Sequence, residues 1–114
     1  MVSPAADALA VTFADPPPQA SPWCFYYWMS DNLSREGITR DLEAMHRVGI
    51  RQALIGNIFD ERLPAGDTKL FTEGWWDHLL HAVREGQRLG VDIGLFNCPG
   101  WSQSGGPWIN EGQT

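Results

Sequence analysis

Three short apolar runs alternate with two longer segments of helical periodicity, and this alternation constrains the fold more than any other feature of the sequence. The apolar runs cover residues 23–29 (WCFYYWM), 52–59 (QALIGNIF) and 91–96 (VDIGLF), and their length is typical of buried β-strands. Helices are predicted between them, over 35–48 and 73–89. Strands that alternate with helices form a parallel sheet with right-handed crossovers, so an α/β fold is expected.

The helix predicted over 35–48 has clear boundary signals. Ser34 is a suitable N-cap, and Gly49 suits the left-handed position that follows a last turn. Four apolar residues share one face and are expected to be buried: Ile38, Leu42, Met45 and Val48.

The helix predicted over 73–89 has boundaries of the same kind. Thr72 is expected to cap its N-terminus, and Gly90 is expected to end it. Its apolar residues form a stripe that we expect to be buried: Trp76, Leu79, Leu80, Val83 and Leu89.

Three strands and two helices are too few for a complete parallel α/β domain. Both faces of a parallel sheet need a cover, which two helices do not supply. A whole (β/α)₈ barrel takes about 250 residues, whereas this chain has 114. We therefore expect an incomplete (β/α)₈ TIM barrel that comprises roughly its first three β-strands and two helices.

The domain limits follow from the proline content. Residues 1–22 are expected to form an irregular, Pro-rich lead-in, because Pro16, Pro17 and Pro18 favour an extended segment and Pro22 disfavours an early helix. Residues 23–114 are expected to form the N-terminal fragment of the barrel. No secretory signal is recognisable, so the compartment is left unassigned, and a periplasmic or extracellular location stays open for a longer parent protein.

Charge excludes two classes of partner. The chain carries 8 Lys and Arg against 14 Asp and Glu, a formal net charge of −6, and has no basic cluster. We therefore expect no nucleic-acid binding and no docking on an anionic membrane. The 6 Trp, 2 Tyr and 5 Phe residues fill either a core or a site for a sugar ring, which is flat and apolar on one face.

Amide and aromatic residues follow each predicted strand, where parallel α/β proteins place their active sites. Asn32, Asn57 and Asn97 stand at these positions, and amides bind hydroxyl groups as both donors and acceptors. Turns also favour Asn, so a structural role is an equal explanation for Asn32 and Asn57. The loop over 97–109 (NCPGWSQSGGPWI) holds Trp101 and Trp108, which favours a ligand-binding loop over a packing loop.

Three carboxylates, Asp31, Asp60 and Glu61, follow the first two strands. Glycoside hydrolysis usually needs a carboxylate pair, but nothing in the sequence indicates an apolar pocket that would raise one pKa. No catalytic residue is therefore assigned. His78 and His81 lack a third metal ligand nearby, so no metal site is assigned, and Cys24 and Cys98 are expected to be free thiols because opposite strand ends separate them.

Several of these segments together resemble glycoside hydrolase family 106, the α-L-rhamnosidases and related glycosyl hydrolases. The most specific is NCPGWS at 97–102 with SGGPWI at 104–109. Supporting segments are Trp28-Met29 with Asn32, EGIT at 36–39 with DLEAM at 41–45, and Trp75-Trp76. The resemblance covers about residues 13–110.

The resemblance implies a (β/α)₈ catalytic barrel, inverting hydrolysis of terminal rhamnosides in a glycan or glycoside, and a calcium ion at the family's site. It implies substrate contacts for five residues: Trp28, Asn32, Asn97, Trp101 and Trp108. The family's catalytic glutamates belong to later strands, and no calcium ligand can be assigned here. Asp31 stands where the family leads us to expect a small residue such as Gly.

Two functions remain as hypotheses. In the first, the chain is a glycosyl hydrolase fragment that is inactive alone, because the carboxylate pair lies outside it. In the alternative, it is a non-catalytic carbohydrate-binding or self-associating module, in which several copies complete the sheet. A small cofactor-binding domain is excluded because no Gly-rich phosphate loop follows the first strand.

Overall fold

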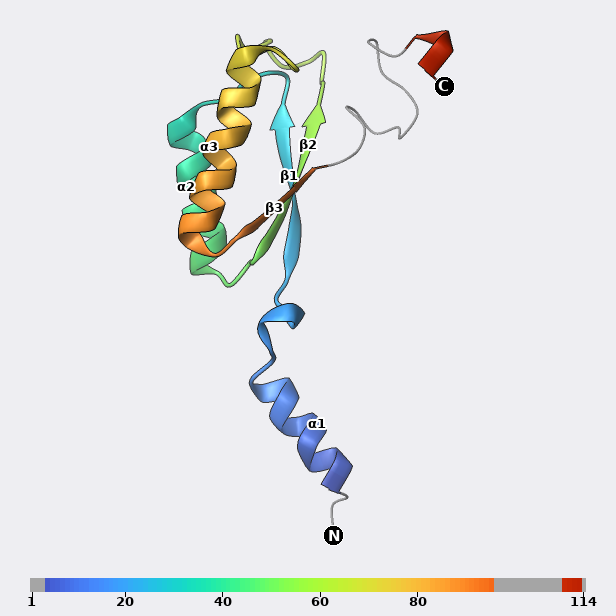
Figure 1. Ribbon diagram of the computed structural model, residues 1–114, viewed down its shortest axis with the longest axis vertical. Coiled ribbons are helices and arrows are strands. Elements are labelled where there is room, and N and C mark those ends of the chain that lie inside the picture. The colour runs from blue at the N-terminus through green and yellow to red at the C-terminus, as the bar shows by residue number, and fades with distance from the viewer. Residues whose placement is uncertain (1–3, 96–109, 114) are drawn as a thin grey trace.

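A computed structural model describes residues 4–95 and 110–113 (Figure 1). Helices and strands alternate through the central part of the chain, with a further helix before them. In chain order the elements are α1 (Pro4–Ala14), η1 (Pro18–Ala20), β1 (Trp23–Met29), α2 (Arg35–Arg47), β2 (Gln52–Ile58), α3 (Glu73–Leu89), β3 (Asp92–Leu95) and η2 (Glu111–Gln113).

The three strands form one parallel sheet in the order β1-β2-β3, as the alternation predicts. Trp23 is paired with Gln52, and Gln52 is paired with Asp92. Helices α2 and α3 lie side by side on one face of the sheet (Figure 1). The core lies between these two layers and consists of Tyr26, Trp28, Ile38, Leu42, Ala53, Ile55, Trp75, Ala82 and Val91.

The opposite face of the sheet carries aromatic residues of β1. Trp23 and Phe25 are each about half exposed, at 52% and 51%, and their rings meet edge to face. Tyr27 is stacked on Phe25 with 5.8 Å between ring centroids. Among the described residues, no helix covers this face (Figure 1). The predicted parallel α/β sheet is therefore confirmed, with both helices on one side of it, and closure into a barrel stays a prediction.

The helix boundaries agree with the predicted caps. The Ser34 hydroxyl accepts a hydrogen bond from Gly37 N–H, and the Thr72 hydroxyl accepts one from Trp75 N–H. Gly49 and Gly90 both have the left-handed backbone expected of them, with φ of 86° and 67°. Because α2 ends one residue before Val48, that side chain lies outside the helix face and is 72% exposed.

The prediction of which residues of α3 are buried is corrected by the structure. Trp75, Ala82 and Gly86 are the buried residues of this helix. In contrast, three members of the predicted stripe are about half exposed: Trp76 (52%), Leu80 (47%) and Val83 (46%). Gly86 lies so close to β3 that a methyl group there would overlap the Val91 carbonyl oxygen and lie 2.8 Å from the Ile93 side chain, so this side of α3 packs tightly in the core.

The irregular lead-in expected over residues 1–22 is also corrected, because α1 occupies Pro4–Ala14. Proline is tolerated at the first helical position, where its missing N–H has no partner in the helix. The alanines that follow favour helix, and Pro22 lies far enough downstream not to interrupt it. Helix α1 projects away from the α/β body (Figure 1), and Phe13 on it is 88% exposed.

Candidate functional site

The ends of β1 and β2 meet at one edge of the sheet, where a parallel α/β protein places its site. Ser30, directly after β1, is only 5% exposed. Its hydroxyl accepts a hydrogen bond from Asp60 N–H at 3.0 Å and donates one to the Asp60 carbonyl at 3.2 Å. One buried serine thus joins the two loops that follow these strands.

The turn after β1 has a left-handed backbone at two consecutive residues, Ser30 (φ 47°) and Asp31 (φ 63°). Aspartate adopts this conformation more readily than most residues, and glycine adopts it freely. The left-handed backbone therefore explains why the family resemblance leads us to expect a small residue such as Gly at position 31.

The loop between β2 and α3 lies against that turn. Gly66 N–H donates to the Ser30 carbonyl at 2.8 Å, and Thr68 N–H donates to the Asp31 carbonyl at 3.3 Å. The Asn32 side-chain amide donates to the carbonyls of Pro64, at 2.8 Å, and Ser30, at 3.0 Å. We call residues 30–32 and 60–69 the loop clasp. The amide N–H groups of Asn32 join the two segments of this clasp. Asn32 therefore has the structural role that the sequence analysis gave as an equal explanation for it.

A hollow of about 370 Å³ lies at the clasp, and the three candidate carboxylate residues are all among those that line it. Three apolar side chains, those of Phe59, Leu63 and Ala65, also line it. Its lining residues are Ser30, Asp31, Phe59, Asp60, Glu61, Leu63 and Ala65.

Two of the three carboxylates are paired with cations. The Asp60 carboxylate accepts hydrogen bonds from the Arg62 guanidinium at 2.9 and 2.7 Å, which, together with the Arg62 backbone N–H, lowers the pKa of Asp60. The Asp31 carboxylate lies 3.3 Å from Lys69 Nζ. A general acid needs a raised pKa, so the lowered pKa of Asp60 argues against that role.

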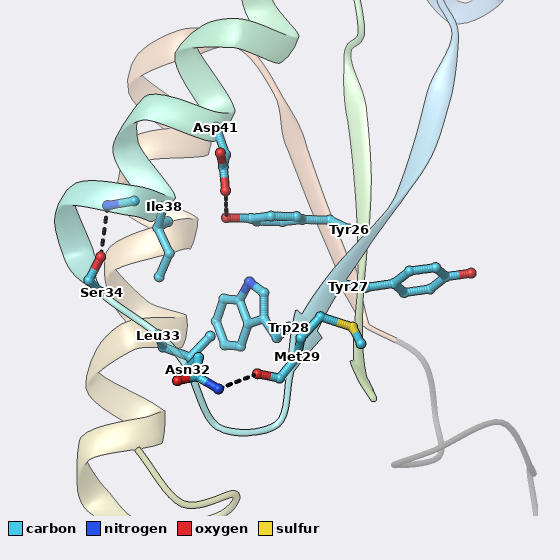
Figure 2. Close-up of a pocket in the computed structure, with 10 residues that line it drawn as sticks. Tyr26, Tyr27, Trp28, Met29, Asn32, Leu33, Ser34, Ile38 and Asp41 are labelled. Carbon is cyan, nitrogen blue, oxygen red and sulfur yellow. Dashed lines mark hydrogen bonds between the residues drawn. The ribbon is translucent and has the colours of Figure 1, made fainter. Parts of the chain in front are cut away.

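Trp28 and Tyr26 lie on the helix-facing side of β1, whereas Tyr27 points to the opposite side (Figure 2). Trp28 is 3% exposed, and its ring packs edge to face against Trp75 with 6.0 Å between centroids. Trp75 in turn donates its indole N–H to the Asn57 side-chain carbonyl at 2.9 Å. Trp28 therefore belongs to the core and is not among the residues that line the hollow.

A second cavity, of about 190 Å³, lies between β1 and the first half of α2 (Figure 2). The Tyr26 hydroxyl donates to the Asp41 carboxylate at 2.9 Å across it. Burial, and then the hydrogen bond to Asp41 and its negative charge, raise the pKa of Tyr26. Trp28 and Asn32 both line this cavity, so the structure brings two of the five predicted contact residues together.

The other three predicted contact residues, Asn97, Trp101 and Trp108, lie outside the described residues, as does Cys98. Cys24 is a free thiol in the part of the chain that the structure describes. The imidazoles of His78 and His81 contact backbone carbonyls, of Gly74 at 2.7 Å and of Arg35 at 3.0 Å.

The described residues do not fit a calcium ion. Within 4–95 and 110–113, no three His, Cys, Asp or Glu side chains gather so that they could hold a metal. Two of the three carboxylates of the hollow are already paired with cations, Asp31 with Lys69 and Asp60 with Arg62. Over the same ranges, no helix is both long enough and apolar enough to cross a membrane.

Sequence reasoning missed Ser30, Gly66, Tyr26 and Asp41. The contact of Ser30 with Asp60 joins residues that are 30 positions apart in the chain. The contact of Tyr26 with Asp41 joins residues that are 15 positions apart. No local pattern indicates such a pair. Gly66 has a visible signal, since glycine often marks a close backbone approach, but its neighbour is not visible in the sequence.

Comparisons with known proteins all match glycoside hydrolases. Residues 14–114 match glycoside hydrolase family 106, described as alpha-L-rhamnosidase. A Formosa agariphila protein named "Putative beta-glucuronidase" is 43% identical over 98 residues, which are 86% of this chain and 8% of that protein. The solved structure of a rhamnosidase from Novosphingobium sp. PP1Y is 37% identical with a TM-score of 0.67, over 89% of this chain and 10% of that one.

This chain thus spans about a tenth of the length of the proteins that it matches. The family match covers nearly all of its described residues, including both loops of the clasp. The chain belongs to glycoside hydrolase family 106.

Proposed function

We propose that this chain forms the first β/α units of a (β/α)₈ catalytic barrel in an enzyme that hydrolyses terminal α-L-rhamnosides. The observation that carries the proposal is the family match over residues 14–114, together with 37% identity to a solved rhamnosidase. The parallel strands and the polar residues at their ends support it, because barrel enzymes build their sites at that end.

In this proposal the hollow beside the loop clasp is part of the wall of the sugar site. Phe59 and Leu63 offer apolar surface there, and the Glu61 carboxylate offers an acceptor for sugar hydroxyl groups. Asn32, Asn97, Trp101 and Trp108 are proposed to contact the substrate. Trp28 is proposed to support the end of β1 from behind, since its ring is buried among the helices.

The chemistry is proposed to be inverting, with the acid and base outside this chain. An inverting pair needs one carboxyl of raised pKa and a separation of about 6.5–9.5 Å. Asp60 has a lowered pKa, and Asp31 is paired with Lys69. Any calcium ligands of a whole enzyme are likewise expected outside the described residues, so no step is assigned to a metal.

A chimaera tests this proposal. The corresponding segment of the Novosphingobium rhamnosidase is replaced by this chain, and hydrolysis of an aryl α-L-rhamnoside is measured beside that of an aryl β-D-glucuronide. We expect the chimaera to hydrolyse the rhamnoside and this chain alone to hydrolyse neither. Turnover by the 114-residue chain alone, or a folded chimaera without activity, contradicts the proposal.

The alternative function is a carbohydrate-binding or self-associating module. The observation that favours it is the aromatic face of β1, on which Trp23 and Phe25 are half exposed. It predicts a monodisperse dimer in light scattering, with tryptophan fluorescence that responds to L-rhamnose. Trp23→Ala should then abolish the dimer, whereas the substitution Trp76→Ala on the helix layer should leave it intact.

A further inference from the structure

We propose that one side of α3, formed by Trp76, Leu80 and Val83, is the docking surface for a further amphipathic helix, the one that follows β3 in the proposed barrel. We call these three residues the α3 flank. The inference rests on the barrel of the proposed function but not on its rhamnosidase chemistry. It also differs from the alternative function, which uses the aromatic face of β1 on the other side of the sheet.

The α3 flank is a second apolar stripe on a helix that already has a buried one. Trp75, Ala82 and Gly86 are buried in the core. The flank residues stand at positions i, i+4 and i+7, so they share a different side of the helix. Their exposed fractions are 52%, 47% and 46%. A surface helix normally has a single apolar stripe, so a second stripe indicates a second packing partner.

Phe71 extends this apolar surface beyond the end of the helix. Its ring stacks on that of Trp76 with 6.2 Å between centroids, and the side chain is 52% exposed. Four large apolar side chains thus form one continuous, half-exposed patch. Patches of this kind mark interaction surfaces, whereas apolar residues scattered singly over a surface do not.

Helix α2 occupies the other side of α3 and binds it through polar groups. The His81 imidazole contacts the Thr39 hydroxyl at 2.9 Å, and the Arg88 guanidinium donates to the Glu43 carboxylate at 2.9 Å. At about 100° per residue, the core-facing side of α3 separates His81 and Arg88 from the flank. The flank therefore faces away from α2, and a different element must cover it.

The sheet gives the position and direction of that element. Strand β3 lies at the edge of the sheet next to β2, and α2 and α3 lie side by side on one face (Figure 1). Crossovers between parallel strands are right-handed. The helix that follows β3 in a barrel therefore lies on the same face, beyond α3 and parallel to it. That place adjoins the flank, whose three side chains are all uncharged, so the docking helix presents an apolar stripe.

Cysteine labelling in two settings tests the inference. Leu80→Cys is introduced into the 114-residue chain and into the chimaera with the Novosphingobium rhamnosidase, which supplies the rest of the barrel. Alkylation by iodoacetamide at position 80 is followed by mass spectrometry of the proteolytic peptide, which separates it from the native cysteines. We expect alkylation to be slower in the chimaera by at least about 100-fold, because the docking helix must open first.

Two further variants complete the design. Arg84→Cys is the matched control, since Arg84 is an exposed residue of α3 outside the flank, and it should be alkylated at similar rates in both settings. Val83→Cys replaces Leu80→Cys if that variant does not fold in the chimaera. Equal protection of positions 80 and 84 would contradict docking at the flank.

The rhamnosidase activity of the same chimaera separates this inference from the proposed function. Protection at position 80 in a chimaera without activity supports the docking helix and counts against the proposed chemistry. An active chimaera in which Leu80→Cys reacts as fast as in the 114-residue chain overturns the docking helix alone. Slow alkylation in the 114-residue chain that becomes faster on dilution also overturns it, because a second copy then covers the flank. A chimaera that does not fold contradicts it as well, since a matching flank should accept its neighbouring helix.

Discussion

The α-carbon of Gly66 lies directly against the backbone of Asp31, so that a methyl group added at Gly66 would overlap the Asp31 carbonyl oxygen. The same approach lets Gly66 N–H donate to the Ser30 carbonyl. No residue other than glycine fits there without a shift of one loop. This contact closes the loop clasp at the end of the sheet where the proposed sugar site lies.

Gly66→Ala should therefore destabilise the chain by about 2 kcal/mol, as overpacking against backbone does. The free energy of unfolding in urea measures the effect. Gly74→Ala is the matched control, because a methyl group there meets only the Thr72 hydroxyl, at 4.0 Å. Alanine favours helix over glycine, so this control should be neutral or stabilising. Equal stability of both variants contradicts the close approach.

The left-handed backbone of Asp31 makes a second prediction. Asp31→Gly should be more stable than Asp31→Ala by about 1 kcal/mol, because alanine is strained at positive φ and glycine is not. Both substitutions remove the ion pair with Lys69, so the difference between them isolates the backbone. At Asp77, inside α3, the same two substitutions should rank in the reverse order. An Asp31→Ala variant at least as stable as Asp31→Gly rejects the left-handed turn.

The pKa of Asp60 should depend on Arg62. The folded-state pKa lies below the ordinary value of 3.8 because of Arg62. The stabilisation from this pair is therefore fully present above pH 3.8 and is lost as the pH falls through the lower, folded-state pKa. In Arg62→Gln the Asp60 carboxyl should titrate at higher pH, which ¹³C NMR of the carboxyl carbon measures. Arg40→Gln, which breaks a pair with Glu36, should leave Asp60 unchanged; an unchanged titration in Arg62→Gln would reject the assignment.

The two neighbouring tryptophans of α3 should differ strongly. Trp75→Ala removes a side chain that is 3% exposed and leaves the Asn57 carbonyl without its donor, so a loss of about 3–5 kcal/mol is expected. Trp76→Ala removes a half-exposed ring that stacks on Phe71, and a loss of about 1 kcal/mol is expected. Urea unfolding compares them directly. A larger loss of stability for Trp76→Ala than for Trp75→Ala would instead support the predicted stripe, in which Trp76 is buried.

The boundaries of the helices could be predicted from the sequence because they depend on neighbouring residues. Ser34 and Thr72 cap N–H groups three residues ahead, and Gly49 and Gly90 adopt the left-handed backbone that ends a helix. The α/β order follows from the same local patterns. Helix α1 departs from the prediction because its alanines favour helix, whereas the prolines on its C-terminal side lie beyond its last residue.

What only the tertiary structure decided is which side chains meet across long separations in the chain. Periodicity predicts Trp76 in the core, but Trp75 is the buried residue, because it packs against Trp28 and donates to Asn57, which belong to other elements. Three further contacts arise in the same way: those of Ser30 with Asp60, of Asp31 with Gly66 and of Tyr26 with Asp41. Caps and periodicity act within one or two turns of chain, whereas these contacts exist only after the strands and helices have packed.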